Sequence, residues 1–171
     1  ATERYDDLEP LQFAYSLLTR SLRITHENLR TRDPAFVERV ERWYADKAGV
    51  APVPGRRSPP PFLTPFKLRD LVLTNRVVVS PMCQYSAVDG VPNDWHLQHL
   101  ASRAVGGAGL VMTEMTDVSA EGRITPGCLG LYDDATEMAL GATLARARRQ
   151  APPMPVAIQL AHAGRKGSSA R

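Results

Sequence analysis

The pattern of apolar and polar residues divides the chain into a helical part and a part where strands and helices alternate. Near the N-terminus, apolar residues recur at spacings of three and four, as on one face of a helix. These residues are Leu8, Leu11, Tyr15, Leu18 and Leu22. The spacing predicts an amphipathic helix at the start of residues 1–50, which are helical in pattern throughout.

A second helix is predicted from Asp33, which can cap it, and Pro34, which suits its first position. Its expected buried face consists of Phe36, Val37, Val40 and Trp43 or Tyr44. Gly49 supplies a stop signal. Residues 51–61 are rich in proline and lack a hydrophobic period, which is typical of a semi-extended linker. We therefore expect a helical segment over 1–50, a linker over 51–61 and a further part over 62–171.

After the linker, strands and helices alternate. The expected strands are 77–81, 109–115 and 155–161, and the expected helices are about 94–105 and 134–149. Such alternation predicts an α/β fold with a parallel sheet whose outer side is covered by helices. The β-branched run Val77-Val78-Val79 predicts a fully buried strand.

Composition excludes several classes of protein. The net charge of +3 is small, which argues against a nucleic-acid partner. No run of about 18 apolar residues is present, so no membrane span or membrane partner is expected. Cys83 and Cys128 are too few for a disulfide framework. A reducing, cytoplasmic location fits this composition.

Polar and reactive side chains follow the predicted strands. Ser80-Pro81-Met82-Cys83 and Tyr85 follow the first strand, Met115 ends the second, and Gln159 lies in the third. The carboxyl ends of parallel strands meet at one edge, where α/β enzymes place their chemistry. A glutamine inside the third apolar run would be costly to bury without a role. The sequence therefore predicts a site at this edge.

Other reactive residues leave alternatives open. Glu114 is either a site residue or a core-edge carboxylate paired with an arginine. His96 and His99 are three residues apart on a helix, but no cysteine or carboxylate stands at ligand spacing. The pattern favours packing histidines, and we expect no metal. A buried, inert thiol is the favoured interpretation of Cys128.

Six sequence strings stand in order between about Pro60 and Arg171. They are LTPF (63–66), SPMCQYS (80–86), WHLQH (95–99), GAGLV (107–111), EGRIT (121–125) and QLAHAGRK (159–166). Together they resemble the opening of old yellow enzymes, in the branch that has a cysteine beside the flavin. The resemblance implies an FMN-dependent ene-reductase that uses NADH or NADPH, built on a (β/α)8 TIM barrel. That barrel needs roughly 250 residues. We therefore expect a fragment with about three of its strands, inactive by itself.

The resemblance also implies roles for single residues. The positions that would contact FMN are Ser80, Pro81, Met82, Cys83, Met115 and Gln159. Cys83 would lie near the O4/N5 edge of the flavin and Gln159 at its pyrimidine edge. Most members of the family have a small residue where Met115 stands. Tyr85 would contact substrate or donate a proton to it, so Tyr85 and Cys83 are the candidate catalytic residues.

The helical head carries a second resemblance, in the strings YDDLEP (5–10), LLTRS (17–21) and ITHENLR (24–30). They are similar to the C-terminal end of FAD-dependent aromatic monooxygenases. In particular, they are similar to bifunctional proteins that join an aryl-CoA hydroxylase to a reductase, such as salicylyl-CoA 5-hydroxylase and anthraniloyl-CoA monooxygenase. This implies an upstream FAD module and a small-molecule substrate, either an activated alkene or an aromatic CoA thioester. The alternatives are a stand-alone FMN ene-reductase with a helical interaction arm, or a non-catalytic fragment. A homo-oligomer stays open.

Overall fold

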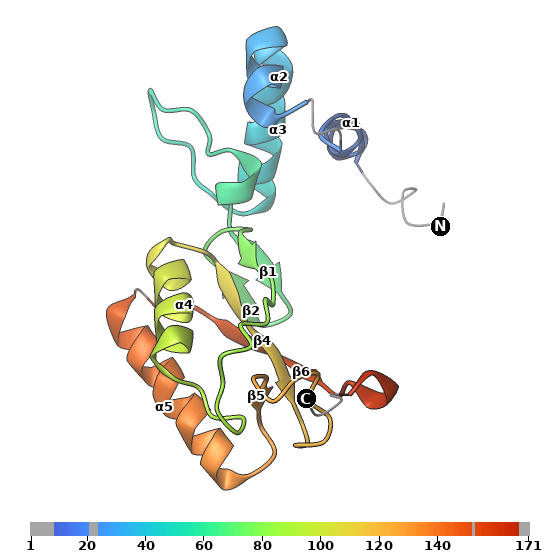
Figure 1. Ribbon diagram of the computed structural model, residues 1–171. Coiled ribbons are helices and arrows are strands. Elements are labelled where there is room, and N and C mark those ends of the chain that lie inside the picture. The colour runs from blue at the N-terminus through green and yellow to red at the C-terminus, as the bar shows by residue number, and fades with distance from the viewer. Residues whose placement is uncertain (1–8, 21–23, 152, 168–171) are drawn as a thin grey trace. The chain divides into compact units, whose positions relative to one another are not determined.

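The structure is a computed structural model that describes residues 9–20, 24–151 and 153–167. It divides into two compact units, Ala1–Asn75 and Arg76–Arg171, each considered by itself (Figure 1). Leu8 and Leu22, two positions of the first predicted apolar stripe, lie outside the described residues. Within those ranges no helix has the length and apolar character needed to cross a membrane.

The first unit begins with three helices, α1 (Pro10–Leu18), α2 (His26–Arg32) and α3 (Pro34–Lys47). The predicted start of α3 is confirmed, because the Asp33 side chain accepts a hydrogen bond from the Phe36 amide at 2.9 Å. Gly49 follows its end with a φ of +69°, as expected of a glycine stop.

The helix α2 was not predicted as a separate element. It is separate because Thr25 and Asn28 bond reciprocally across its first turn. The Thr25 hydroxyl accepts from the Asn28 amide, and the Asn28 side chain accepts from the Thr25 amide. On α3, the buried side chains are Val37, Val40, Glu41, Tyr44 and Ala45, so Tyr44 is buried and Trp43 only half-buried.

The same unit ends in a small hairpin. After a 3-10 turn, η1 (Pro61–Leu63), strands β1 (Phe66–Leu68) and β2 (Leu71–Leu73) pair antiparallel. Arg69, in the tight turn between them, has a φ of +53°. The sequence pattern did not indicate this hairpin. Residues 51–60, all of them described, contain neither helix nor strand.

Apart from one two-residue strand that was not predicted, the second unit has the predicted alternation of strand and helix. Its elements are β3 (Val78–Val79), α4 (Asp94–Val105), β4 (Leu110–Asp117), β5 (Leu129–Gly130), α5 (Asp134–Gln150), β6 (Val156–Ala161) and the 3-10 turn η2 (Gly164–Lys166). Both β3 and β6 run parallel to β4, and Val111 has a partner in each of them. The central strand β4 therefore has β3 on one edge and β6 on the other.

The helices α4 and α5 lie side by side over this sheet (Figure 1). The core between them and the sheet contains Leu97, Leu100, Ala101, Val111 and Ala147. Asn93 caps α4 with a reciprocal bond to His96, and Gly106 ends that helix. This packing fixes the direction in which the strand ends point.

The prediction of a fully buried first strand is wrong. Val77 is 40% exposed and Val78 is 45% exposed. The strand β3 pairs on one side only, with β4, and Val79 is its residue that packs against the core. Full burial needs cover on both faces of a sheet. For the same reason Ile158 and Leu160 of β6 are exposed.

Candidate active site

Three of the predicted site residues lie together at the carboxyl ends of the strands. Met115 of β4 is paired with Gln159 of β6. The Met115 backbone in turn contacts the Cys83 side chain, in the loop that follows β3, closely enough to lower the pKa of that thiol. Gln159 is exposed and Cys83 is half-buried. The structure thus gathers a thiol, a backbone segment and an exposed amide at one edge of the sheet.

Tyr85 belongs to the same cluster, because its side chain and that of Cys83 act on each other's pKa. Burial is the main cause that raises the pKa of the Cys83 thiol, and the nearby Glu114 charge raises it further. The charge of Cys83 in turn raises the pKa of Tyr85, which is 52% exposed. At neutral pH both groups therefore carry their protons and can act as hydrogen-bond donors.

The backbone at Tyr85 is strained. Its φ is +52°, a left-handed conformation that bulky residues rarely adopt. Gly127 lies against it: a Cβ added there would be 2.5 Å from the Tyr85 carbonyl oxygen. The Ala87 amide also donates to the Gly127 carbonyl at 2.9 Å. The glycine therefore holds the strained turn in place at close range.

The remaining predicted contacts stand on the same loop. Ser80 is exposed and Pro81 half-buried. The Met82 carbonyl accepts from the Gln84 side chain at 2.6 Å, and the Gln84 oxygen accepts from the Trp95 indole at 2.9 Å. These bonds tie the loop to the start of α4.

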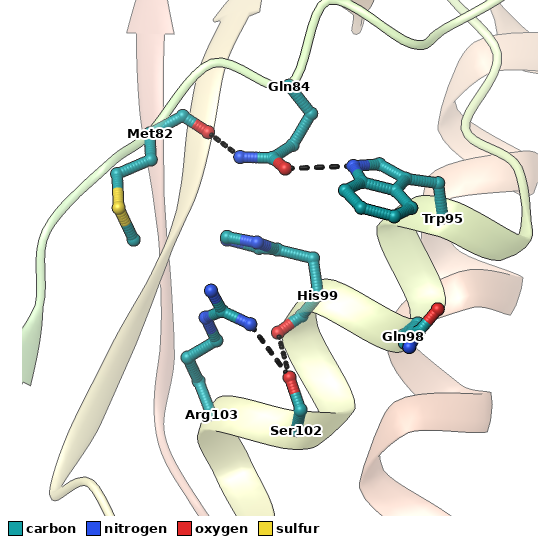
Figure 2. Close-up of a pocket in the computed structure, with 7 residues that line it drawn as sticks. All are labelled: Met82, Gln84, Trp95, Gln98, His99, Ser102 and Arg103. Atoms are coloured by element: carbon teal, nitrogen blue, oxygen red, sulfur yellow. Dashed lines mark hydrogen bonds between the residues drawn. The ribbon is translucent and has the colours of Figure 1, made fainter.

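A hollow of about 200 Å³ lies beside these bonds. It is lined by Met82, Gln84, Trp95, Gln98, His99, Ser102 and Arg103 (Figure 2). Burial lowers the pKa of His99, and the Arg103 charge lowers it further. His99 is therefore a neutral imidazole at neutral pH, able to donate and to accept a hydrogen bond.

Glu114 does not pair with an arginine. Its carboxylate lies 3.0 Å from His96 Nε2, and both side chains are buried. A shift of strand register between Met112 and Met115 explains why consecutive residues, Thr113 and Glu114, are both buried. The partner of Glu114 therefore comes from α4, which a strictly alternating strand pattern does not indicate.

Sequence reasoning also missed Asp117, the last residue of β4. It is completely buried, and neither carboxylate oxygen has a hydrogen-bond partner. Burial raises the pKa of Asp117, while the charges of His162 and Arg123 act in the opposite direction. A single acid after an apolar strand run is the only signal that the sequence contains.

The buried Asp117 carboxyl should make stability fall as pH rises. Because its pKa is raised in the folded protein, the folded state binds the proton more tightly, and stability is lost above the unfolded value of about 4. We expect Asp117→Asn to gain stability relative to wild type between pH 4 and pH 8 in urea unfolding. Asp133, whose pKa is lowered by bonds from Thr136, behaves oppositely: Asp133→Asn should be less stable than wild type above about pH 4, and this difference should disappear as the pH falls below that value. An equal difference between Asp117→Asn and wild type at both pH values would contradict this prediction.

Over the described residues, no group of three metal-type ligands gathers at one point. The two histidines of α4 instead have different surroundings. His96 contacts Glu114, whereas His99 lines the hollow.

Comparison with known proteins identifies the family of this chain. The model of the NADH:flavin oxidoreductase / NADH oxidase family matches residues 61–170. The NADPH dehydrogenase of Bacillus licheniformis is 46% identical over 105 residues, which are 60% of this chain and 30% of that protein. The NADPH dehydrogenase of Listeria monocytogenes is 46% identical over 103 residues, or 59% of this chain and 30% of the relative.

Solved structures give the same result. Morphinone reductase in complex with tetrahydroNAD aligns with a TM-score of 0.54 and 29% identity, covering 59% of this chain and 27% of that chain. The old yellow enzyme from Trypanosoma cruzi aligns with a TM-score of 0.54 and 26% identity, covering 62% and 28%. The chain thus spans less than a third of these relatives, and its α/β unit resembles part of an old yellow enzyme TIM barrel, which confirms the predicted fold class. With residues 61–170 matched, the chain belongs to the NADH:flavin oxidoreductase / NADH oxidase family of old yellow enzymes.

Proposed function

We propose that this chain supplies part of the flavin site of an FMN-dependent NAD(P)H oxidoreductase of the ene-reductase type. The observation that carries the proposal is the chain of contacts from Cys83 through Met115 to Gln159. It joins, at one sheet edge, three residues that the family resemblance assigns to the flavin. The name NADPH dehydrogenase, shared by several relatives, supports NADPH as the reductant.

The residues present fit an isoalloxazine ring. The exposed amide of Gln159 offers both donors and an acceptor to a ring edge that needs both. The Cys83 thiol is protonated and can donate a weak hydrogen bond beside it. FMN, when bound, would supply hydride transfer between a nicotinamide and an activated alkene. Met115 is larger than the small residue usual in the family, so it would narrow the space over the ring.

Tyr85 is suited to the substrate side of the reaction. Its side chain lies close to that of Cys83, is half exposed, and keeps its proton at neutral pH. Such a phenol can donate a hydrogen bond to a substrate carbonyl or a proton to the reacting carbon. Tyr85 and Cys83 are therefore our candidate catalytic residues.

The full-length protein tests this function directly. We expect purified protein to release FMN and to oxidise NADPH or NADH when an α,β-unsaturated ketone such as 2-cyclohexen-1-one is added. Mass spectrometry identifies the released flavin, and product analysis identifies the reduced alkene. Protein that is folded but binds no FMN would refute the proposal.

Replacing Cys83 should change the redox properties of the site. We expect Cys83→Ala to shift the FMN reduction potential by on the order of 10–30 mV, the size of one weak hydrogen bond, while the fold is kept. Spectroelectrochemical titration measures the potential. Cys128→Ala is the matched control, because that thiol is buried and bonded to Thr125. An unchanged potential in Cys83→Ala would remove the tuning role.

We further propose that the parent protein is bifunctional, with residues 1–50 ending an FAD-dependent aromatic monooxygenase module. The support is the resemblance of the helical head, which forms three helices ahead of the proline-rich residues 51–61. An aromatic CoA thioester would be the substrate of the upstream module. Full-length protein should then release FAD and FMN in equal amounts. FMN alone would favour the stand-alone reductase with a helical interaction arm.

A further inference from the structure

A buried acid lies directly beneath the loop that carries Cys83 and Tyr85. Glu114, near the end of β4, is only 5% exposed. Its partner His96, on α4, is 2% exposed. Burying an acid in this way is costly unless it is paired and hydrogen-bonded. The proposed roles of the flavin-site residues do not use it, so its contacts need an explanation.

The contacts of Glu114 are directional. The Gln84 backbone amide donates to Glu114 Oε2 at 2.5 Å, a short, charge-assisted bond. On the other side, His96 Nδ1 accepts from the Asn93 amide at 3.1 Å, and His96 Nε2 lies 3.0 Å from Glu114 Oε1. That second contact misses hydrogen-bond geometry, so its attraction is electrostatic.

The bond between the Gln84 amide and Glu114 matters because of where Gln84 stands in the loop. Gln84 stands between Cys83 and Tyr85, so a bond to its amide restrains both neighbouring side chains. The Glu114 charge also acts on the Cys83 thiol itself. The other titratable groups that act on this thiol are Cys128, from the loop before β5, and Tyr85, from its own loop.

We propose that Glu114 is a positioning residue, whose carboxylate holds the loop of Cys83 and Tyr85 on β4 through the Gln84 amide and places a negative charge beside that loop. Its importance for catalysis rests on the proposed function. The physical effect on the loop and the thiol does not, because it needs only the contacts described. His96 supports this role by holding the carboxylate in place from α4.

The effect of this charge on Cys83 can be tested by alkylation with iodoacetamide in the full-length protein. Only the thiolate attacks, forming the sulfur–carbon bond as iodide leaves. At pH 7.5 we expect Glu114→Gln to raise the alkylation rate at Cys83 roughly threefold or more, because the repelling charge is gone. Peptide mass spectrometry separates Cys83 from Cys128. An unchanged rate in folded Glu114→Gln would overturn the proposal.

The pH dependence of the alkylation rate distinguishes the effect of the Glu114 charge from the effect of looser packing around Cys83. If charge is the cause, the profile of Glu114→Gln moves to lower pH, while its alkaline plateau stays within about twofold of wild type. A raised plateau without that displacement would mean only a more accessible thiol, and would overturn the proposal. Glu137→Gln, the same change at an exposed residue of α5, should leave the profile unchanged.

The role of Glu114 in positioning the loop can be tested by hydrogen exchange at the Gln84 backbone amide. Its hydrogen exchange should be roughly fivefold faster or more in Glu114→Gln, because a neutral acceptor binds the amide less strongly. An unchanged exchange rate would remove the anchoring role.

His96→Gln keeps the proposal testable if Glu114→Gln fails to fold. It leaves the Glu114 charge in place without its partner, so alkylation at pH 7.5 should be equal to or slower than in wild type. Faster alkylation would contradict the proposed role of Glu114. If these results hold but the full-length protein binds no FMN, the proposed function fails while the role of Glu114 in the loop stands.

Discussion

Replacing Gly127 by alanine should disrupt the candidate site. A Cβ at this position would lie 2.5 Å from the Tyr85 carbonyl oxygen and 2.7 Å from its carbonyl carbon. Both are backbone atoms, so no side-chain rotation can relieve the contact. The turn at Tyr85 is already strained, with a φ of +52°. We expect a loss of roughly 1–3 kcal/mol in the free energy of unfolding.

The same change should reduce activity in the full-length protein. A displacement of about 1 Å in a catalytic group can cost up to about 100-fold in rate, so alkene reduction should fall by at least roughly tenfold. Gly141→Ala is the matched control, since a Cβ there meets nothing within 4 Å. That change lies inside α5 and should instead stabilise the protein by roughly 0.5–1 kcal/mol. Equal stability and activity in both variants would contradict the role assigned to Gly127.

The order of strands and helices in the α/β unit could be predicted from the sequence because local patterns determine it. Apolar runs predicted β3, β4 and β6, whereas the two-residue strand β5 was missed. The hairpin β1–β2 was missed, because its two strands are three residues each and are joined at Arg69 rather than at a glycine or asparagine turn. Strands of three residues are too short to show a recognisable alternation of apolar and polar residues.

Burial was harder to predict than secondary structure. The run Val77-Val78-Val79 looked like a buried strand, but exposure depends on what covers each face of the sheet. The apolar residues of a strand indicate only that its burial would be favourable. They do not indicate which neighbouring element would bury it.

The part of the candidate site that could be predicted is the part that depends on the order of the strands. Cys83, Met115 and Gln159 could be placed together because each lies in the carboxyl half of a strand of one parallel sheet or in the loop that follows it. The pair of His96 and Glu114 could not be predicted, because the shift of register in β4 changes which residues face α4. A shift of register cannot be predicted from the alternation of apolar and polar residues alone.

Removing Glu41 should strongly destabilise the helical unit. Glu41 of α3 is 2% exposed and lies 2.9 Å from both His26 Nε2 and the Arg30 guanidinium. Through His26 the network reaches α1, because the Tyr15 hydroxyl is 3.0 Å from His26 Nδ1. Glu41→Ala would leave two donors without their buried acceptor. We expect a cost of roughly 3 kcal/mol, at the lower end for a broken buried pair, because Arg30 is partly exposed.

Hydrogen exchange at the amides of α3 measures this cost locally, without requiring the unit to be isolated. Glu38→Ala is the matched control on the same helix. Its partner Arg42 is 3.7 Å away and both side chains are exposed, so we expect a change below about 0.5 kcal/mol. A similar acceleration of exchange in both variants would mean that the buried network adds nothing beyond helix propensity. The difference between the two variants therefore isolates what the buried carboxylate contributes to holding α2 on α3.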